Sequence, residues 1–251
     1  MIKKIKILIV TMFLTAFGGV TYADFQDGYD AYNKSDYKTA LREWQPLADQ
    51  GDADAQFLLG RMYDTGRGLL KDYKQAEKWY RKAADQGNVL AQYSLGLMYY
   101  TGVGAPKNYK QAVKWYQKAA DQGYALAQFN LALMYAKGEG VLKDDKQAVK
   151  WYQKAADQGY ASAQYNLGVM YANGRGVLKD DKQAVKWYQK AADQGYAMGQ
   201  NNLGWMYANG EGVLKDMTKA KYWIKKAYEG NDTAASNLAK ENWERFELWK
   251  Y

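Results

Sequence analysis

Hydrophobic and polar positions recur along this chain every 36 residues, from residue 52 to residue 231, without an insertion or a deletion. Two of the blocks, those that start at Tyr124 and Tyr160, differ at only 6 of 36 positions. The five blocks begin at Asp52, Asn88, Tyr124, Tyr160 and Tyr196. A fixed period of this length is typical of a solenoid, in which each copy buries its apolar face against its neighbours.

Each block predicts two helices joined by a loop. Apolar side chains lie at positions i, i+4, i+7 and i+8 of the first helix, which in the third block are Ala127, Leu131, Met134 and Tyr135. Gly138 and Gly140 follow, and both permit the positive φ angles that end a helix and turn the chain. Asp144 is the predicted N-cap of the second helix, with Gln147 at capping-box spacing, and Gly159 marks its predicted end.

Neighbouring helices are expected to lie antiparallel and in contact, because only a few residues separate one from the next. We therefore predict an all-α fold, an α/α superhelical solenoid of antiparallel helix pairs. Each block also places one tryptophan on its second helix, which we interpret as a core residue between hairpins. These residues are Trp79, Trp115, Trp151, Trp187 and Trp223.

Three consecutive motifs in each block are specific enough to suggest a family. They read Ala-x-Ala-Gln-x-x-Leu-Gly-x-Met-Tyr, Gly-x-Gly-Val-x-x-Asp and Ala-x-x-Trp-Tyr-x-Lys-Ala-Ala-x-Gln-Gly. This pattern over residues 52–231 resembles the Sel-1-like repeat family, relatives of the tetratricopeptide repeat with a longer loop between the two helices. The resemblance implies that the first helices line the inner curve of the solenoid.

The two ends of the array differ from its middle. Residues 24–51 lack the Gly-x-Gly loop and resemble an ordinary tetratricopeptide hairpin, with a kink expected at Pro46. Residues 232–251 begin like another first helix and then depart from the repeat. We expect them to form a C-terminal capping helix.

The first 23 residues have a different composition. Three lysines, at positions 3, 4 and 6, precede an apolar run over residues 7–20, and Thr21-Tyr22-Ala23 places small residues where a signal peptidase reads them. Residues 1–23 are thus predicted to be a signal peptide, with Asp24 first in the mature chain. The 14-residue run is short for a membrane span, and no later segment is apolar enough. We expect a periplasmic or secreted bacterial protein without a transmembrane span after cleavage.

The composition excludes several kinds of chemistry. The chain has no cysteine and no histidine, so it offers no disulfide and no imidazole or thiolate for metal binding or catalysis. No cofactor and no metal site are expected. Loss of the leader removes three lysines and leaves 32 basic and 27 acidic residues, a net charge of +5 instead of +8. This modest charge, together with the export signal, argues against nucleic acid as a partner.

Candidate binding residues lie where the copies disagree with one another. The third, seventh, tenth and thirteenth or fourteenth positions of the blocks vary, and their spacing puts them on one face of the first helix. The candidates are Ser94, Leu97, Tyr100, Asn130, Leu133, Asn166, Val169, Asn202 and Trp205. Asparagines beside apolar side chains suit an extended peptide, because an amide both donates and accepts hydrogen bonds. Alternatively, some of the apolar residues belong to the core and the asparagines are only solvated.

The second helices carry lysines at i, i+4 and i+8 in four of the blocks. The middle lysines Lys114, Lys150 and Lys186 are candidates for contact with an anionic surface. The alternative is a solvated face whose charge is offset by nearby carboxylates, which in the third block are Asp144, Asp145 and Asp157.

The predicted function is to bind a peptide or a protein domain in the concave face, without enzymatic activity, as adaptors of the resembled family do. An immunity protein that neutralises a toxin or an envelope enzyme is the alternative. Binding or hydrolysis of β-lactams, known in cysteine-rich relatives, is weaker because this chain has no cysteine. The segment Ser35-Asp36-Tyr37-Lys38 has the S-x-x-K spacing of penicillin-recognising enzymes, but the S-D-N and K-T-G motifs are absent and helix capping explains Ser35.

Overall fold

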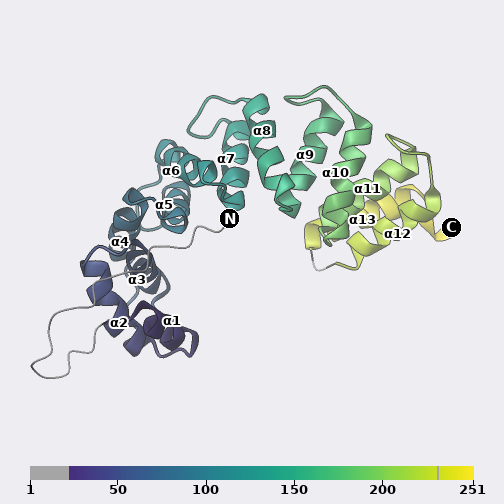
Figure 1. Cartoon of the computed structure of the whole chain (residues 1–251). Helices are drawn as coiled ribbons and strands as arrows, with labels where there is room; N and C mark the ends of the chain where they lie inside the picture. The colour runs from purple at the N-terminus through teal and green to yellow at the C-terminus, as the bar shows by residue number, and fades with distance from the viewer. Residues whose placement is uncertain (1–22, 231) are drawn as a thin grey trace, which may run out of the picture.

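The protein is a curved stack of helices. The computed structural model describes residues 23–230 and 232–251, and within them it contains thirteen α-helices, one short 3₁₀ helix and no strand. Figure 1 shows the helices following an arc from α1 to α13. The predicted all-α solenoid of packed helix pairs is therefore confirmed, whereas the predicted leader, except for Ala23, lies outside the described residues.

The five blocks form five helix pairs in chain order, and each helix packs against the next. The first helices are α3 (Ala53–Thr65), α5 (Val89–Thr101), α7 (Ala125–Lys137), α9 (Ala161–Asn173) and α11 (Ala197–Asn209). The second helices are α4 (Tyr73–Asp85), α6 (Tyr109–Asp121), α8 (Asp145–Asp157), α10 (Asp181–Asp193) and α12 (Met217–Tyr228). The flanking helices are α1 (Phe25–Asn33), α2 (Tyr37–Asp49), α13 (Thr233–Arg245) and the 3₁₀ helix η1 (Leu248–Lys250).

Local sequence signals fix the helix ends. The Asp144 carboxylate accepts a hydrogen bond from the backbone N–H of Gln147 at 3.0 Å, which satisfies a donor that the first turn of α8 leaves free. The same cap begins the other second helices, at Asp72, Asn108, Asp180 and Asp216. Gly138 ends α7 at a φ of 75°, and Gly140 follows at 74°, so both glycines of the loop adopt the left-handed conformation predicted for them.

The core lies between the two helix layers as a series of buried clusters along the stack. Ala127, Leu131 and Met134 are at most 1% exposed, as their stripe predicts. The tryptophan prediction holds for four of the five positions, for example Trp151 at 4% exposed. Trp223 is only half-buried, although it still packs against the core of the last repeats. In the four buried cases a lysine three residues later lies 4.0–4.4 Å from the indole centroid, whereas Lys226 lies 5.7 Å from the ring of Trp223.

A buried glutamine in each of the first four pairs joins three helices, whereas Gln200 of the fifth pair bonds only to the carbonyl of Ala192. The side-chain amide of Gln128 in α7 donates to the carbonyl of Ala120 at 3.1 Å, and its oxygen accepts from Nε2 of Gln158 at 2.8 Å. The equivalent glutamines are Gln56, Gln92, Gln164 and Gln200, and all are buried. Because every buried amide must find partners, these bonds set how one pair sits on the next.

Both ends of the stack are closed by non-repeating elements. The helix α2 continues through Pro46 to Asp49, so this proline does not end it. The helix α13 packs against both α11 and α12, and Leu248 of η1 is fully buried beneath it. No helix in residues 23–230 and 232–251 has the length and apolar character that a membrane crossing requires.

Candidate functional site

The candidate residues lie on the first helices, on the inner side of the arc. Figure 1 shows α5 and α7 on this side and α6 and α8 on the outer side. All nine candidates keep solvent-accessible surface: eight are half-buried, and Leu97 is 41% exposed. The face that varies between the copies is therefore distinct from the fully buried stripe of Leu131 and its equivalents. We call this inner surface, from α5 to α13, the concave groove.

Four of the candidates line one pocket in the middle of the concave groove. Its volume is about 120 Å³, and its walls are Leu97 and Tyr100 of α5, Asn130 and Leu133 of α7, and Tyr116 of α6. Burial raises the pKa of the Tyr116 hydroxyl, with the Asn130 side chain acting in the opposite direction, so this phenol stays protonated. The pocket thus combines aliphatic walls with a neutral polar floor. It suits one apolar side chain whose backbone bonds to an amide.

A larger pocket, of about 640 Å³, lies at the C-terminal end of the concave groove. Asn202 and Trp205 of α11 line it together with Glu241, Asn242 and Arg245 of α13. Sequence reasoning interpreted α13 only as a cap and missed these three residues. Burial raises the pKa of the Tyr188 hydroxyl, another lining group, to about 12, with its hydrogen bond to Asn202 acting in the opposite direction. The lining offers amides, opposite charges and one large aromatic surface.

Beside the large pocket, the last repeat replaces both members of an aromatic pair that the earlier repeats share. An aromatic residue on the first helix packs against a tyrosine on the second in the earlier repeats, as in Tyr165 and Tyr188, whose ring centroids are 5.9 Å apart. The other pairs are Phe57 with Tyr80, Tyr93 with Tyr116, and Phe129 with Tyr152. In the fifth repeat these positions hold Asn201 and Ile224. This change is visible in the sequence and could have indicated the site.

Three candidates, Ser94, Asn166 and Val169, line neither pocket. The side-chain amide of Asn166 donates to the carbonyl of Ser162 in its own helix, at 2.8 Å. Its N–H is thus partly engaged before any ligand arrives, which weakens the expectation that this amide bonds to a peptide. Asn130 also has an internal contact, donating to the Tyr93 hydroxyl at 3.4 Å.

The lysines of the second helices are exposed, and the carboxylates expected to offset them are engaged elsewhere. Asp144 caps α8, Asp145 pairs with Arg175 at 2.8 Å, and Asp157 accepts from Gln153. Within the described parts of the chain, no ion pair reaches Lys114, Lys150 or Lys186, the middle lysines of their helices. We call this row of exposed lysines on the outer helices the positive stripe.

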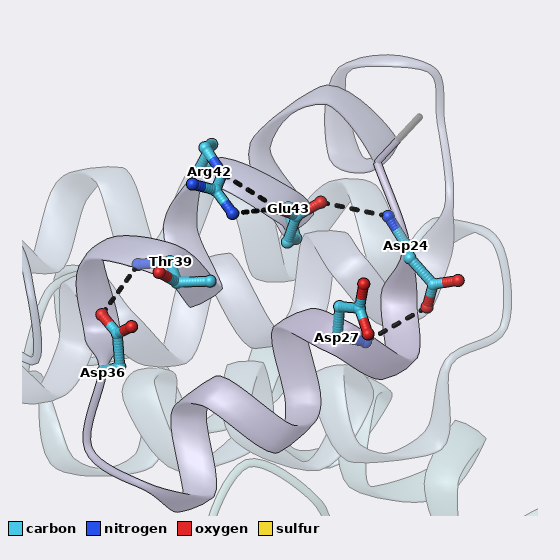
Figure 2. Close-up of polar contacts among 6 residues, drawn as sticks. All are labelled: Asp24, Asp27, Asp36, Thr39, Arg42 and Glu43. Carbon is cyan, nitrogen blue, oxygen red and sulfur yellow. Dashed lines mark hydrogen bonds and ion pairs between the residues drawn. The ribbon is translucent and has the colours of Figure 1, made fainter. Parts of the chain in front are cut away.

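The S-x-x-K segment is a tight turn between α1 and α2. The structure corrects the expectation that Ser35 caps a helix: Asp36 caps α2, accepting from the backbone N–H of Thr39 at 3.1 Å, as Figure 2 shows. Ser35 instead has a φ of 64°, and its hydroxyl oxygen accepts a hydrogen bond from Tyr37. Across residues 23–230 and 232–251, no group of three or more acidic, histidine or cysteine side chains is placed to hold a metal ion.

The fold defines a class of protein, an α-solenoid of repeated helix pairs. A model of the Sel1 repeat matches residues 53–88, 89–124, 125–160, 161–196 and 197–232. The chain belongs to the Sel1 repeat family. Repeats of this family generally mediate protein interactions.

Two solved structures share this architecture. A Sel1 repeat protein from Oxalobacter formigenes is 36% identical, with a TM-score of 0.82, over 86% of this chain and 88% of its own. The protective antigen c5321 of uropathogenic Escherichia coli strains, described as displaying an SLR fold, is 41% identical with a TM-score of 0.77. That match covers 82% of this chain but only 44% of the antigen, so this chain spans less than half of its length. No curated protein matches the chain.

Proposed function

We propose that this chain is an exported bacterial binding protein that holds a peptide or a protein domain in the concave groove. The proposal rests on one observation: six of the nine candidate residues, chosen because they vary between the repeats, line the two pockets of the groove. Export is proposed from the leader-like composition of residues 1–23. The known tendency of Sel1 repeats to mediate protein interactions supports the same role.

The chemistry of the two pockets favours an extended polypeptide over a small metabolite. The central pocket accepts an apolar side chain, while the amides of Asn130 and Asn202 lie where they could bond to a peptide backbone. Trp205 offers the kind of aromatic anchor that dominates the energy of protein interfaces. A partner that bridges both pockets would contact the helices from α5 to α13.

The test is affinity capture of the mature chain from its native envelope, followed by measurement of the dissociation constant for the purified partner. Substituting Leu97 and Leu133 with alanine should weaken binding at least about tenfold. A matched control substitutes Leu142 and Leu178, which are 91% exposed on loops outside the groove, with alanine. Equal affinity of the groove variant, the control and the wild type would refute the proposal.

An immunity role uses the same groove, with a toxin or an envelope enzyme as the bound protein. It is distinguished by inhibition: the captured enzyme should lose activity when the wild-type chain is added, and keep it when Trp205→Ala is added. A β-lactam role predicts turnover of nitrocefin by the purified chain alone, and we expect none.

A second contact is proposed for the positive stripe on the outer helices, because its middle lysines are exposed and lack ion pairs. We propose that Lys114, Lys150 and Lys186 attract an anionic surface. Replacing all three with glutamine should lower binding to anionic vesicles, and the difference should shrink as salt is raised. Binding that is independent of both changes would exclude this contact.

A further inference from the structure

A carboxylate occupies the tryptophan position in the first hairpin. Glu43 lies 36 residues before Trp79, the first of the repeated tryptophans, and so has the same register on its helix. Its side chain is only 9% exposed. Each buried tryptophan packs against the hairpin that precedes its own. Glu43, in the first hairpin, instead contacts Asp24 at the start of α1. A buried charge at this position needs a partner.

Two groups contact this carboxylate, as Figure 2 shows. Oε1 accepts from Nε and Nη2 of Arg42 at 2.9 and 2.7 Å, and Oε2 accepts from the backbone N of Asp24 at 3.2 Å. The Arg42 side chain is 70% exposed, so much of its charge is solvated. These contacts, with Arg42 first and the Asp24 amide second, hold the pKa of Glu43 below its usual value.

Helical structure begins immediately after Asp24. Its carboxylate caps α1, accepting from the backbone N–H groups of Gln26 and Asp27 at 2.7 and 3.1 Å. Its carbonyl accepts from the backbone N of Gly28 at 3.1 Å, closing the first turn. Asp24 is also the residue that the sequence predicts to be first in the mature chain, since the signal peptidase motif ends at Ala23.

We propose that cleavage after Ala23 gives Glu43 a second cationic partner beside Arg42: the α-ammonium of Asp24, which forms an ion pair with the Glu43 carboxylate and locks the first hairpin. A signal peptidase would add water across the Ala23–Asp24 peptide bond. Ala23 leaves with the leader as a carboxylate, and the freed amine of Asp24 takes up a proton at neutral pH. This ion pair can form only when the leader has been removed.

The exchange of an amide for an ammonium improves the contact in two ways. Arg42 donates twice to Oε1, so Oε2 has the weaker contact, a single backbone N–H at 3.2 Å, whereas an ammonium offers three donors and a full charge. A positive charge at a helix N-terminus is opposed by the helix dipole. Here the Glu43 carboxylate, whose Oε2 lies 3.2 Å from the backbone nitrogen of Asp24, offsets the opposition.

The experiment compares two purified chains by thermal unfolding, one beginning at Asp24 and one beginning at Ala23, each with and without Glu43→Gln. The chain that begins at Asp24 should melt about 2–4 °C higher. This gap should disappear in the Glu43→Gln background. Glu247→Gln is the matched control, because Glu247 forms an exposed ion pair with Lys250 at the other end of the stack and should leave the gap unchanged.

Equal melting temperatures of the two wild-type chains, or an equal gap in the Glu43→Gln background, would overturn the proposal. A second measurement covers the case in which Glu43→Gln does not fold. The N-terminal residue of the wild-type protein recovered from the cell envelope should be Asp24, and cleavage at any other bond would also overturn the proposal.

Discussion

The side-chain amide of Asn242 in α13 donates a hydrogen bond to Oδ1 of Asn201 in α11, at 2.9 Å and across 41 residues of chain. Both side chains are buried, at 7% and 1% exposed. The bond joins the capping helix to the last repeat at the position where earlier repeats place an aromatic ring. It therefore holds the wall of the larger pocket and the end of the stack together.

Replacing Asn242 with alanine should destabilise the protein by about 1–3 kcal/mol, because it leaves a buried acceptor on Asn201 without its partner. Asn209→Ala is the control, since Asn209 is exposed and bonds only to the carbonyl of Trp205 in its own helix. Denaturant unfolding measures both variants. Equal midpoints for the two variants would show that the buried bond contributes nothing.

The two classes of tryptophan should respond differently to truncation. Trp151→Ala removes a ring that is 4% exposed and should cost about 3–5 kcal/mol. Trp223→Ala removes a half-buried ring and should cost clearly less, because less apolar surface returns to water. Denaturant unfolding of the two variants gives this ranking, and a reversed order would contradict the burial pattern.

Two glycines that both have positive φ angles should differ in their tolerance of alanine. Gly159 and Gly176 have φ angles of 88° and 71°, so alanine at either site carries a left-handed penalty of about 1–2 kcal/mol. A Cβ on Gly159 would meet nothing within 4 Å, whereas one on Gly176 would lie 2.2 Å from the carbonyl oxygen of Asp145. Gly176→Ala should therefore melt at the lower temperature, and identical melting curves would refute this reasoning.

The ion pair between Asp145 and Arg175 predicts a small loss of stability in acid. Hydrogen bonding to Arg175 lowers the pKa of Asp145 below that of an unfolded aspartate, about 3.9. The contribution is thus complete at neutral pH and is lost as the pH falls through the folded-state value, below about 4. It should amount to less than about 1 kcal/mol because the guanidinium is 42% exposed.

Thermal unfolding of Asp145→Asn between pH 7 and pH 3 measures this contribution. The variant should melt lower than the wild type at pH 7 and approach it at pH 3. Asp181→Asn, at the same position one repeat later, is the control, because the facing loop residue there is Glu211 instead of an arginine. A constant gap for Asp145→Asn at all pH values would contradict the assignment.

Variation between the copies brings together some residues that are neighbours in the structure. Leu97, Tyr100, Asn130 and Leu133 all vary between copies, and all four line one pocket. Spacing alone could not separate them from Asn166, whose amide bonds to its own helix. Both residues occupy the same face, and the difference lies in contacts that span the helix and its neighbours.

The sequence by itself determined the repeat, the helix pairs and most of the helix ends, because these depend on contacts within a few residues: the apolar stripe of α7, the cap at Asp144, the left-handed glycine at 138. Only the tertiary structure decided how the two ends of the stack are covered and where the pockets lie. The bond from Asn242 to Asn201 and the contact of Glu43 with Asp24 join residues 41 and 19 positions apart. Such contacts depend on how whole helices pack, so they cannot be predicted from the sequence pattern of a few neighbouring residues.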